Sequence, residues 1–427
     1  MRRAPARSGA AAIDPRAHQT PHRRSLLSGP AVEIIIVNWN SRQHTLDCLS
    51  AVEAQLPDVD GSSITVVDNG STDGSASSIA TRFPKAKLFA LARNRGFTGG
   101  IAAALRGSTA RNVIFLNNDA VPERGWLAAI VRAIDSAPDD VVSAGGKIVD
   151  MSGKFIDFIG GVVTFDGHAF QEGFRQPLGT RHEPHDGAEI LFACGGNMIS
   201  RRARLMELGA FDDDYFAYLE DVDFGWRSWL AGYRHVFTSR AVVRHASSAT
   251  SDRLGNFERG VLFERNALQT AIKNYGDAAF REVSAAIFYA YLHRLHHFAT
   301  TRNERAGELR REPFTGTSPA RPAPSLLGRV RRKLFGRRPL ATIDDPLTAM
   351  QFRAFEWIVS NEKKIIAKRE AVQSKRRRAD EEIFKRFPLH FVPTYPGDEA
   401  LMNGPLFALL RPPLPAVDRK LSDIIRS

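Results

Sequence analysis

Four short apolar runs in this chain each end abruptly in a cluster of acidic, amide and small residues. The clearest covers residues 64–74, where Ile-Thr-Val-Val is followed by Asp-Asn-Gly-Ser-Thr-Asp-Gly. Such runs are typical of buried strands, and Asp, Asn and Gly are typical of the turns that end them. The other three runs, residues 34–37, 113–116 and 216–219, end at Asn38-Trp39-Asn40, Asn117-Asn118-Asp119 and Glu220-Asp221-Val222-Asp223.

This alternation predicts an α/β fold. Helical patterns fill the gaps between the runs, for example over residues 42–55 and 125–136, and continuous apolar strands imply a sheet covered on both faces. In such sheets ligands bind beyond the carboxyl ends of the strands. We therefore expect the polar ends to meet in one cleft. The alternative for each cluster is an ordinary strand-ending turn.

The 427 residues suggest more than one region. We expect a disordered basic arm over residues 1–30, the α/β domain over 31–277 and a helical, basic region over 278–427. Within the last, residues 278–300 are expected to be helical, 303–325 to be a Pro-rich linker, 326–338 a basic amphipathic helix and 346–386 one long helix. The tail after Pro388 is expected to be irregular.

Positive charge is concentrated in the flanks. Of the net charge of +12, residues 1–30 hold six Lys or Arg and one acid, and residues 301–380 hold twenty and nine, so the rest of the chain is net negative. The sequence has no run of 18 apolar residues, so we expect no membrane-spanning helix. The basic N-terminus is not followed by an apolar segment, so we do not expect a secretory signal. Two distant cysteines, Cys48 and Cys194, suggest a reducing compartment.

Several motifs occur in a recognisable order. They are VNWN at residues 37–40, VDNGSTDG at 67–74, RNRGFTGG at 93–100, LNND at 116–119, CGGNM at 194–198, FD at 211–212, YLEDVDFGWR at 218–227 and VVRH at 242–245. Over residues 32–275 the set resembles a family 2 glycosyltransferase, in its rhamnosyltransferase-like branch. The resemblance implies a GT-A fold: a Rossmann-like, mostly parallel sheet with flanking helices.

The resemblance also implies a site for a nucleotide-sugar donor. An ionised Asp68 can accept the imide N–H of uracil or thymine, and Asn38 and Asp73 suit the ribose or base. The glycines of residues 96–100 would let the backbone approach a phosphate, with a helix starting near Gly99. Plain turns are the alternative. The complete expected set is Asn38, Asn40, Asp68, Asn69, Ser71, Asp73, Asn94, Gly96, Phe97, Gly100, Asn117, Gly195, Gly196 and Glu220.

The reaction itself is expected to rest on Asp221, Asp119 and His245. Asp221 stands in the catalytic acid motif, where it would act as general base for inverting transfer, with Glu220 and Asp223 raising its proton affinity. Asp119 and His245 would bind Mn²⁺ or Mg²⁺, although Asn117 replaces the first Asp of the usual metal motif. The alternatives are a helix N-terminal acid for Asp221 and a structural role for His245.

The resulting hypothesis is an inverting, metal-dependent hexosyltransferase of cell-surface polysaccharide synthesis. Its donor would be dTDP-rhamnose, or alternatively UDP-galactofuranose or a UDP-hexose, and its acceptor a glycan or a polyprenyl-diphosphate-linked sugar. The basic flanks are either solvated or dock a cytoplasmic enzyme on the anionic inner face of the membrane. A catalytically silent nucleotide-binding scaffold is the alternative class, and no recognition helix or zinc pattern supports nucleic-acid binding.

Overall fold

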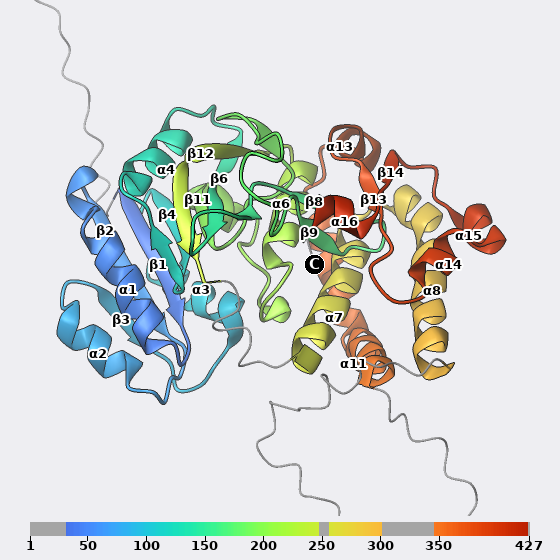
Figure 1. Ribbon diagram of the computed structural model, residues 1–427, viewed down its shortest axis with the longest axis horizontal. Helices are drawn as coiled ribbons and strands as arrows, with labels where there is room; N and C mark the ends of the chain where they lie inside the picture. The colour runs from blue at the N-terminus through green and yellow to red at the C-terminus, as the bar shows by residue number, and fades with distance from the viewer. Residues whose placement is uncertain (1–30, 247–255, 301–345, 426–427) are drawn as a thin grey trace, which may run out of the picture.

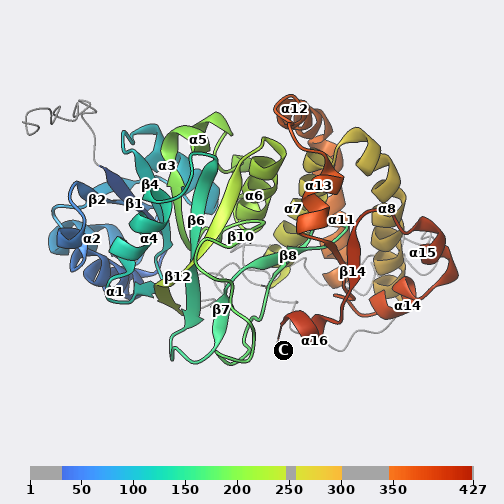
Figure 2. The same cartoon turned by 90° about the horizontal axis from the view of Figure 1, so that it is seen from above.

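The computed structural model describes residues 31–246, 256–300 and 346–425. In Figures 1 and 2 a sheet flanked by helices occupies one half of the molecule, and the C-terminal helices occupy the other. The expected disordered arm, the Pro-rich linker and the amphipathic segment of residues 326–338 lie outside the described residues.

The core of the first half is a sheet of ten strands. The main path runs β10-β12-β6-β11-β4-β1-β2-β3, while β5 pairs with β12 and β7 pairs with β6. The strands are β1 (Val32–Asn38), β2 (Ser62–Asp68), β3 (Lys87–Ala90), β4 (Asn112–Asn117), β5 (Ala120–Pro122), β6 (Val141–Asp150), β7 (Ile156–Phe158), β10 (Glu189–Ile190), β11 (Asn197–Arg201) and β12 (Arg234–His245).

The predicted α/β fold is confirmed, and the sheet combines parallel pairs, among them β6 with β12, with antiparallel ones. Strands β4, β1, β2 and β3 are parallel, whereas β11 lies antiparallel between β4 and β6. The register of the parallel part decides where a site can form. Asn38 pairs with Asp68, and Val37 pairs with Asn117. Three of the four predicted polar clusters therefore follow strand ends at one edge of the sheet.

Both faces of this sheet are covered. All seven residues of β1 are buried, and alternate residues join different apolar clusters, Ile34 and Ile36 on one face and Ile35 and Val37 on the other. This is the pattern of a strand buried on both sides. The helices of this half are α1 (Arg42–Glu53), α2 (Ser75–Arg82), α3 (Gly96–Arg106), α4 (Trp126–Asp135), α5 (Arg202–Glu207) and α6 (Glu220–Leu230), with 3₁₀ turns η1 (Leu56–Asp58) and η2 (Asp213–Tyr215).

The prediction of a strand over residues 216–219 is wrong. This segment is a loop between η2 and α6, and Phe216, Tyr218 and Leu219 all have positive φ, at 64°, 70° and 63°. A short apolar run cannot be assigned by periodicity alone, and this run lacks the β-branched residues of the true strands. The backbone is instead turned back on itself immediately before Glu220.

The second half consists mainly of helices. The single helix predicted over residues 346–386 is three helices, because the chain turns at Asn361 and again where the amides of Arg377 and Arg378 donate to the Leu230 carbonyl, at 2.7 and 3.1 Å. The predicted helix over 278–300 is confirmed. The elements are α7 (Asn256–Asn274), α8 (Asp277–Thr300), α11 (Pro346–Ser360), α12 (Glu362–Gln373), α13 (Asp380–Arg386), β13 (Leu389–Phe391), α14 (Asp398–Met402), α15 (Pro405–Leu410), β14 (Ala416–Asp418) and α16 (Leu421–Ile424).

Buried charges join the two halves. The hairpin of β8 (Gly161–Val163) and β9 (Ala169–Gln171) leaves the first half, and Asp166 at its turn binds Arg294 of α8 at 2.8 Å. Arg294 is 3 % exposed and also binds Asp398 at 3.0 Å. On the other side of Asp166, His168 lies 3.0 Å from Glu264 of α7. Each of these charges has an opposite charge beside it, as burial requires.

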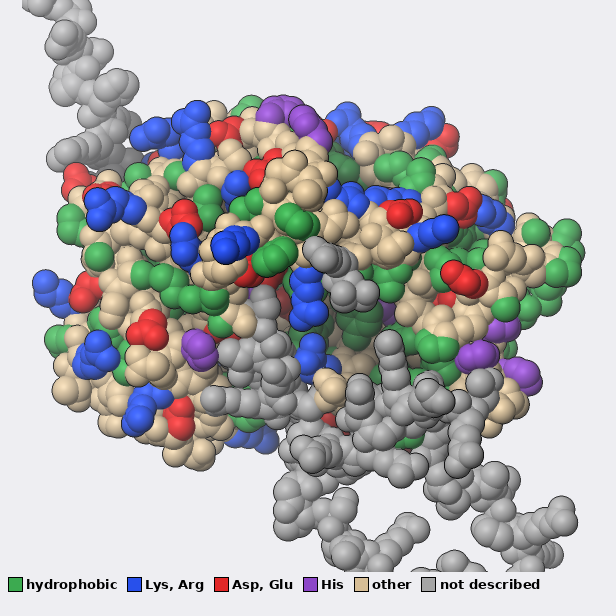
Figure 3. Space-filling view, in the orientation of Figure 1, with side chains coloured by type: hydrophobic (Ala, Val, Ile, Leu, Met, Phe, Trp, Pro, Cys, Tyr) green, Lys and Arg blue, Asp and Glu red, His purple; other side chains and the backbone are tan. Residues whose placement is uncertain are grey.

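The basic run of α12 is turned toward the first half. Lys364 and Lys368 pair with Asp212 and Asp214. After the end of α12, Arg376 donates to the Asn274 carbonyl of α7 at 2.6 Å, within the second half. On the face shown in Figure 3, Lys and Arg side chains are interspersed with Asp and Glu. Part of the described basic run is therefore used in contacts within the chain, while Lys363, Lys375 and Arg377 are exposed. None of the described helices combines the length and the apolar character that crossing a bilayer requires.

Candidate functional site

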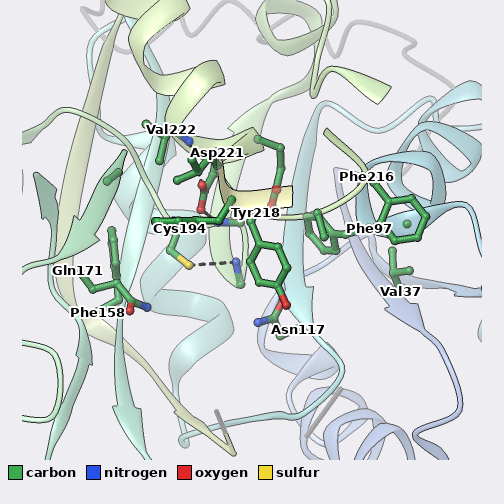
Figure 4. Close-up of a pocket in the computed structure, with 18 of the residues that line it drawn as sticks. Val37, Phe97, Asn117, Phe158, Gln171, Cys194, Phe216, Tyr218, Asp221 and Val222 are labelled. Atoms are coloured by element: carbon green, nitrogen blue, oxygen red, sulfur yellow. Dashed lines mark hydrogen bonds between the residues drawn. The ribbon is translucent and has the colours of Figure 1, made fainter. Parts of the chain in front are cut away.

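A pocket of about 520 Å³ opens at the carboxyl edge of the parallel strands. Figure 4 shows Asp221, Cys194 and Tyr218 in its middle, with Val37, Phe97 and Phe216 toward one end and Phe158 and Gln171 toward the other. Eleven of the residues predicted from the sequence line it, namely Asn69, Asn94, Gly96, Phe97, Asn117, Asp119, Gly195, Gly196, Glu220, Asp221 and His245. Trp39 and Asn118, which belong to the same motifs but were not in the predicted set, line it as well.

Asp68 and Asn38 lie behind the pocket wall rather than on it. Asp68 is 2 % exposed and accepts bonds from Asn38 Nδ2 at 2.7 Å and from the Ser71 amide at 3.1 Å. Asn38 is fully buried, and its Oδ1 accepts from Thr45 Oγ1 at 2.7 Å. The network fixes the turn after β2 against the turn after β1, which matches the alternative interpretation of Asp68 as a turn residue.

Asn40, Asp73 and Gly100 also shape the backbone. Asn40 has φ of 50° and accepts from the Thr72 amide at 2.7 Å, while Asp73 accepts from the amides of Arg42 and Ser75, both at 3.0 Å. A Cβ on Gly100 would lie 2.7 Å from Val37 Cγ1, so glycine there lets α3 pack closely on β1. None of the three lines the pocket.

The glycine-rich segment begins α3 at Gly96 rather than near Gly99. Gly96 has φ of 76°, and a Cβ there would lie 2.3 Å from the Phe216 carbonyl oxygen, so the left-handed backbone and the close approach both require glycine. Asn69 donates to Asn94 Oδ1 and to the Gly96 carbonyl, both at 2.9 Å. The amide-rich start of α3 is thereby held at one end of the pocket.

Glu220 and Asp221 form a carboxyl pair in the middle of the pocket. Asp221 accepts from the Gly195 amide at 3.0 Å and from the Val222 amide at 2.8 Å, and burial raises its pKa. Burial and the adjacent Asp221 raise the pKa of Glu220 to about 8. Glu220 is 7 % exposed, and its Oε2 has no hydrogen-bond partner among the described residues. Two carboxyls so close do not readily ionise together.

The third acid of the motif, Asp223, forms ion pairs with two cations. Asp223 is fully buried and binds Arg227 at 2.8 Å and Lys273 at 3.0 Å. Although burial opposes ionisation, these cations lower the pKa of Asp223. It is a neutralised structural charge that anchors α6 to α7. Trp226 and Trp229 on the same helix are also fully buried, as core residues are.

The backbone before the carboxyl pair is held by Asn266, which sequence reasoning missed. Its Nδ2 lies 3.1, 2.9 and 2.8 Å from the carbonyl oxygens of Tyr215, Ala217 and Tyr218. Asn266 is fully buried on α7. Three residues with positive φ persist in one loop only when the surroundings fix them, and this side chain supplies much of that constraint.

Asp119 and His245 meet in the wall of the pocket. His245 Nε2 lies 3.0 Å from Asp119 Oδ1, and His245 Nδ1 lies 3.0 Å from Asp157 Oδ2. Although burial opposes protonation, the hydrogen bonds to Asp119 and Asp157 raise the pKa of His245 to about 10. Asp157, which the sequence motifs do not contain, orients the ring as carboxylates orient metal-binding histidines.

The pair suits a divalent ion. A carboxylate oxygen and an imidazole nitrogen are ligand types that such ions accept, although here Asp119 Oδ1 and His245 Nε2 are hydrogen-bonded to each other. Within residues 31–246, 256–300 and 346–425, no group of three or more His, Cys, Asp or Glu side chains is arranged as a complete metal site. Protein ligands alone would therefore leave an ion's coordination unfinished.

The far end of the pocket is apolar. It is lined by Phe158 of β7, by Phe170 of β9, by Phe174 and Phe192, by Phe263 of α7 and by Ile425. No sequence motif marks these residues, which come from five separate stretches of the chain. The other end combines Val37, Phe97 and Phe216 with the side chains of Asn69 and Asn94.

Comparison with known proteins identifies similarities over the first half. Residues 33–209 match the family described as Glycosyl transferase family 2. Over 218 residues the chain is 28 % identical to the N-acetylglucosaminyl-diphospho-decaprenol L-rhamnosyltransferase of Mycobacterium tuberculosis, covering 45 % of this chain and 68 % of that protein. It is also 28 % identical over 116 residues to Glycosyltransferase AglE of Haloferax volcanii, covering 26 % of this chain and 38 % of the relative.

Two solved structures align with the chain at lower identity. The mannosyltransferase PcManGT from Pyrobaculum calidifontis, in complex with GDP-Man and Mn²⁺, aligns with a TM-score of 0.44 and 18 % identity over 78 % of this chain and 87 % of that one. S. aureus TarS 1-349 in complex with UDP-GlcNAc aligns with a TM-score of 0.41 and 19 % identity over 64 % and 74 %.

Proposed function

We propose that this chain, whose residues 33–209 form a glycosyl transferase family 2 domain, moves a sugar from a nucleotide-sugar donor to an acceptor hydroxyl with inversion. The observation that carries the proposal is the position of Asp221. Its partly exposed carboxylate lies in the middle of a pocket with a polar end and an apolar end. The catalytic domain in this proposal spans residues 31–277, and the helical region spans 278–427.

The chemistry assigned to Asp221 is a single displacement. The acceptor oxygen attacks the anomeric carbon, the bond from that carbon to the diphosphate oxygen breaks, and the acceptor proton passes to Asp221. The Gly195 and Val222 amides hold this carboxylate in place, and burial raises its pKa, so it is a stronger base than an exposed aspartate. Direct attack by the acceptor with one base needs no second carboxylate as nucleophile, and such a displacement inverts the anomeric carbon.

The donor nucleotide is assigned to the polar end. Asn69, Asn94 and Gly96 line the pocket. In this structure Asn69 Nδ2 and the Gly96 amide both donate to Asn94 Oδ1, and amide groups of this kind suit phosphate and ribose oxygens. Asp119 and His245 would hold Mn²⁺ or Mg²⁺. The bound ion would supply positive charge to the leaving diphosphate. The protein's own contribution is to place Asp119 and to fix the His245 ring through Asp157.

The first choice of donor is dTDP-rhamnose, supported by the similarity to a protein named as an L-rhamnosyltransferase. UDP-galactofuranose or a UDP-hexose is the alternative. The acceptor is a glycan or a polyprenyl-diphosphate-linked sugar of cell-surface polysaccharide synthesis, since that relative's name contains a diphospho-decaprenol. An enzyme acting on such a lipid would work at the inner face of the cytoplasmic membrane.

A screen of nucleotide sugars tests the proposal. The full chain is melted with each of dTDP-rhamnose, UDP-galactofuranose, UDP-glucose and GDP-mannose, with Mn²⁺ and with EDTA. A ligand that binds only the folded state raises Tm, by about 2.7 kcal/mol of stability at 100 times Kd. We expect one donor to stabilise the chain in Mn²⁺ and then to give transfer. Absence of stabilisation by every donor would overturn the donor assignment, and donor binding without transfer to any acceptor would favour a silent scaffold.

A further inference from the structure

Ile425 lines the pocket although more than 200 residues separate it from the catalytic acids. It follows α16 and forms a parallel bridge with Phe174, while the Gly173 amide donates to the Ile424 carbonyl at 2.8 Å. The end of the described chain therefore forms part of the wall of the site.

The segment that carries Ile425 is anchored by the residues that precede it. Ile424 is fully buried. Upstream, Arg419 binds Glu172 at 3.1 Å and donates to the Asp423 carbonyl at 2.7 Å. Since Glu172 and Phe174 belong to the same stretch after β9, one piece of the chain carries both the anchor and the contact. These contacts fix the position of Ile425.

The surface next to Ile425 is apolar and accessible. Phe170, Phe174 and Phe263 are, like Ile425, only partly buried and line the pocket. Gln171 is the polar side chain on this side in Figure 4. Pockets hold hydrocarbon groups mainly by removing such surfaces from water. A subsite with this composition suits a hydrocarbon better than a hydroxyl-rich sugar.

The subsite belongs with the acceptor on chemical grounds. In Figure 4, Asp221 lies between Phe158 and Gln171 on one side and Val37 and Phe97 on the other. Gln171 also donates to Asp157, which holds His245, so this end adjoins the pair assigned to the metal as well. A nucleotide sugar carries no hydrocarbon chain, so a hydrocarbon group held here would belong to the acceptor.

We infer that Ile425, with Phe170, Phe174 and Phe263, forms a subsite for a hydrocarbon group carried by the acceptor, and that Ile425 is a specificity-determining residue. The inference rests on the proposed function for the division of the substrates into a nucleotide-sugar donor and an acceptor. The apolar subsite itself is independent of which donor sugar is used.

The test is binding of two probes that differ only in hydrocarbon length, octyl β-D-glucopyranoside and methyl β-D-glucopyranoside, by isothermal titration below the micelle concentration. We expect the wild-type chain to bind the octyl compound at least tenfold more tightly. Ile425→Asp should remove about tenfold of that preference, because an apolar contact is replaced by a charge, and should leave stabilisation by the donor unchanged.

Leu409→Asp is the matched control. Leu409 on α15 is 83 % exposed and does not line the pocket, so this variant should retain the octyl preference. If octyl and methyl probes bind equally, or if Leu409→Asp loses the preference while Ile425→Asp keeps it, the inference is wrong. Because the readout needs no transfer, failure of the donor screen would overturn the proposed function without deciding this inference.

Discussion

The two ends of the pocket are built in opposite ways. At the polar end, Asn69, Asn117 and Asp119 each follow a strand of one sheet, and strand register brings them together. At the apolar end, Phe174, Phe263 and Ile425 meet only because the C-terminal region packs back on the first half. Backbone hydrogen bonding thus specifies one end, while tertiary packing specifies the other. Substitutions that act on one end alone can test this division.

The largest expected effect is at Asp221, between the two ends. Asp221→Asn should slow transfer at least about 100-fold, as loss of a general base does, while donor stabilisation and octyl-probe binding persist. Steady-state transfer and thermal melting measure these separately. Asp139→Asn, at an exposed position, is the control. Near-normal turnover in Asp221→Asn would remove the base assignment.

Removing the metal, or substituting the residues assigned to it, should change transfer but not binding at the apolar end. We expect EDTA to abolish transfer and Mn²⁺ to restore it, and Asp119→Ala to raise the Mn²⁺ concentration needed for half-maximal rate by more than Asp157→Asn. For Asp157→Asn an increase of about tenfold is expected, the lower part of the range for residues that orient a metal-binding histidine. Octyl-probe binding should not change. Full activity in EDTA would contradict metal dependence.

Asn266 connects the ends, because it lies on α7 with Phe263 and holds the loop before Glu220. Asn266→Ala leaves buried carbonyls without partners, so it should lower the free energy of unfolding by about 1–3 kcal/mol and reduce transfer as well. Denaturant melts and rate measurements check both effects. Asn256→Ala, at the exposed first residue of the same helix, should have the smaller effect. Equal effects would show that the loop does not depend on Asn266.

The smallest effect concerns Glu220 and pH. Burial and the neighbouring Asp221 raise the pKa of Glu220 from an ordinary 4.5 to about 8, so the folded state binds a proton that the unfolded state releases. Stability attributable to this group is therefore present below about pH 4.5 and is lost as pH rises toward 8. Glu220→Gln should be stabilising relative to wild type at pH 8.5 but not at pH 4.5, by on the order of 1 kcal/mol. Melts at the two pH values measure this, and a pH-independent difference would contradict the raised pKa.

The same division explains what could be predicted from the sequence. Strand ends and glycine motifs are local, so the α/β fold and the pocket's place could be predicted from them. Asp119 and His245 were placed together by the family resemblance, and the structure has them 3.0 Å apart. Asp68 was placed on the wall because a motif does not show that Asn38 and Ser71 occupy its oxygens. Residues 216–219 were assigned to a strand because the contact with Asn266 is long-range. Asp157 and Ile425 carried no local signal, since Asp157 lies on β7, which is separated from the strand of His245 by β6.

The buried charged side chains around Arg294 affect how the molecule unfolds. Separating the C-terminal helices from the β8–β9 hairpin would expose Asp166, Arg294 and Asp398 singly in a partly opened interior, and an unpaired buried charge costs several kcal/mol. A half-opened form is therefore poorly populated. The sheet and the helices behave as one cooperative folding unit, which loses both ends of its pocket in the same transition.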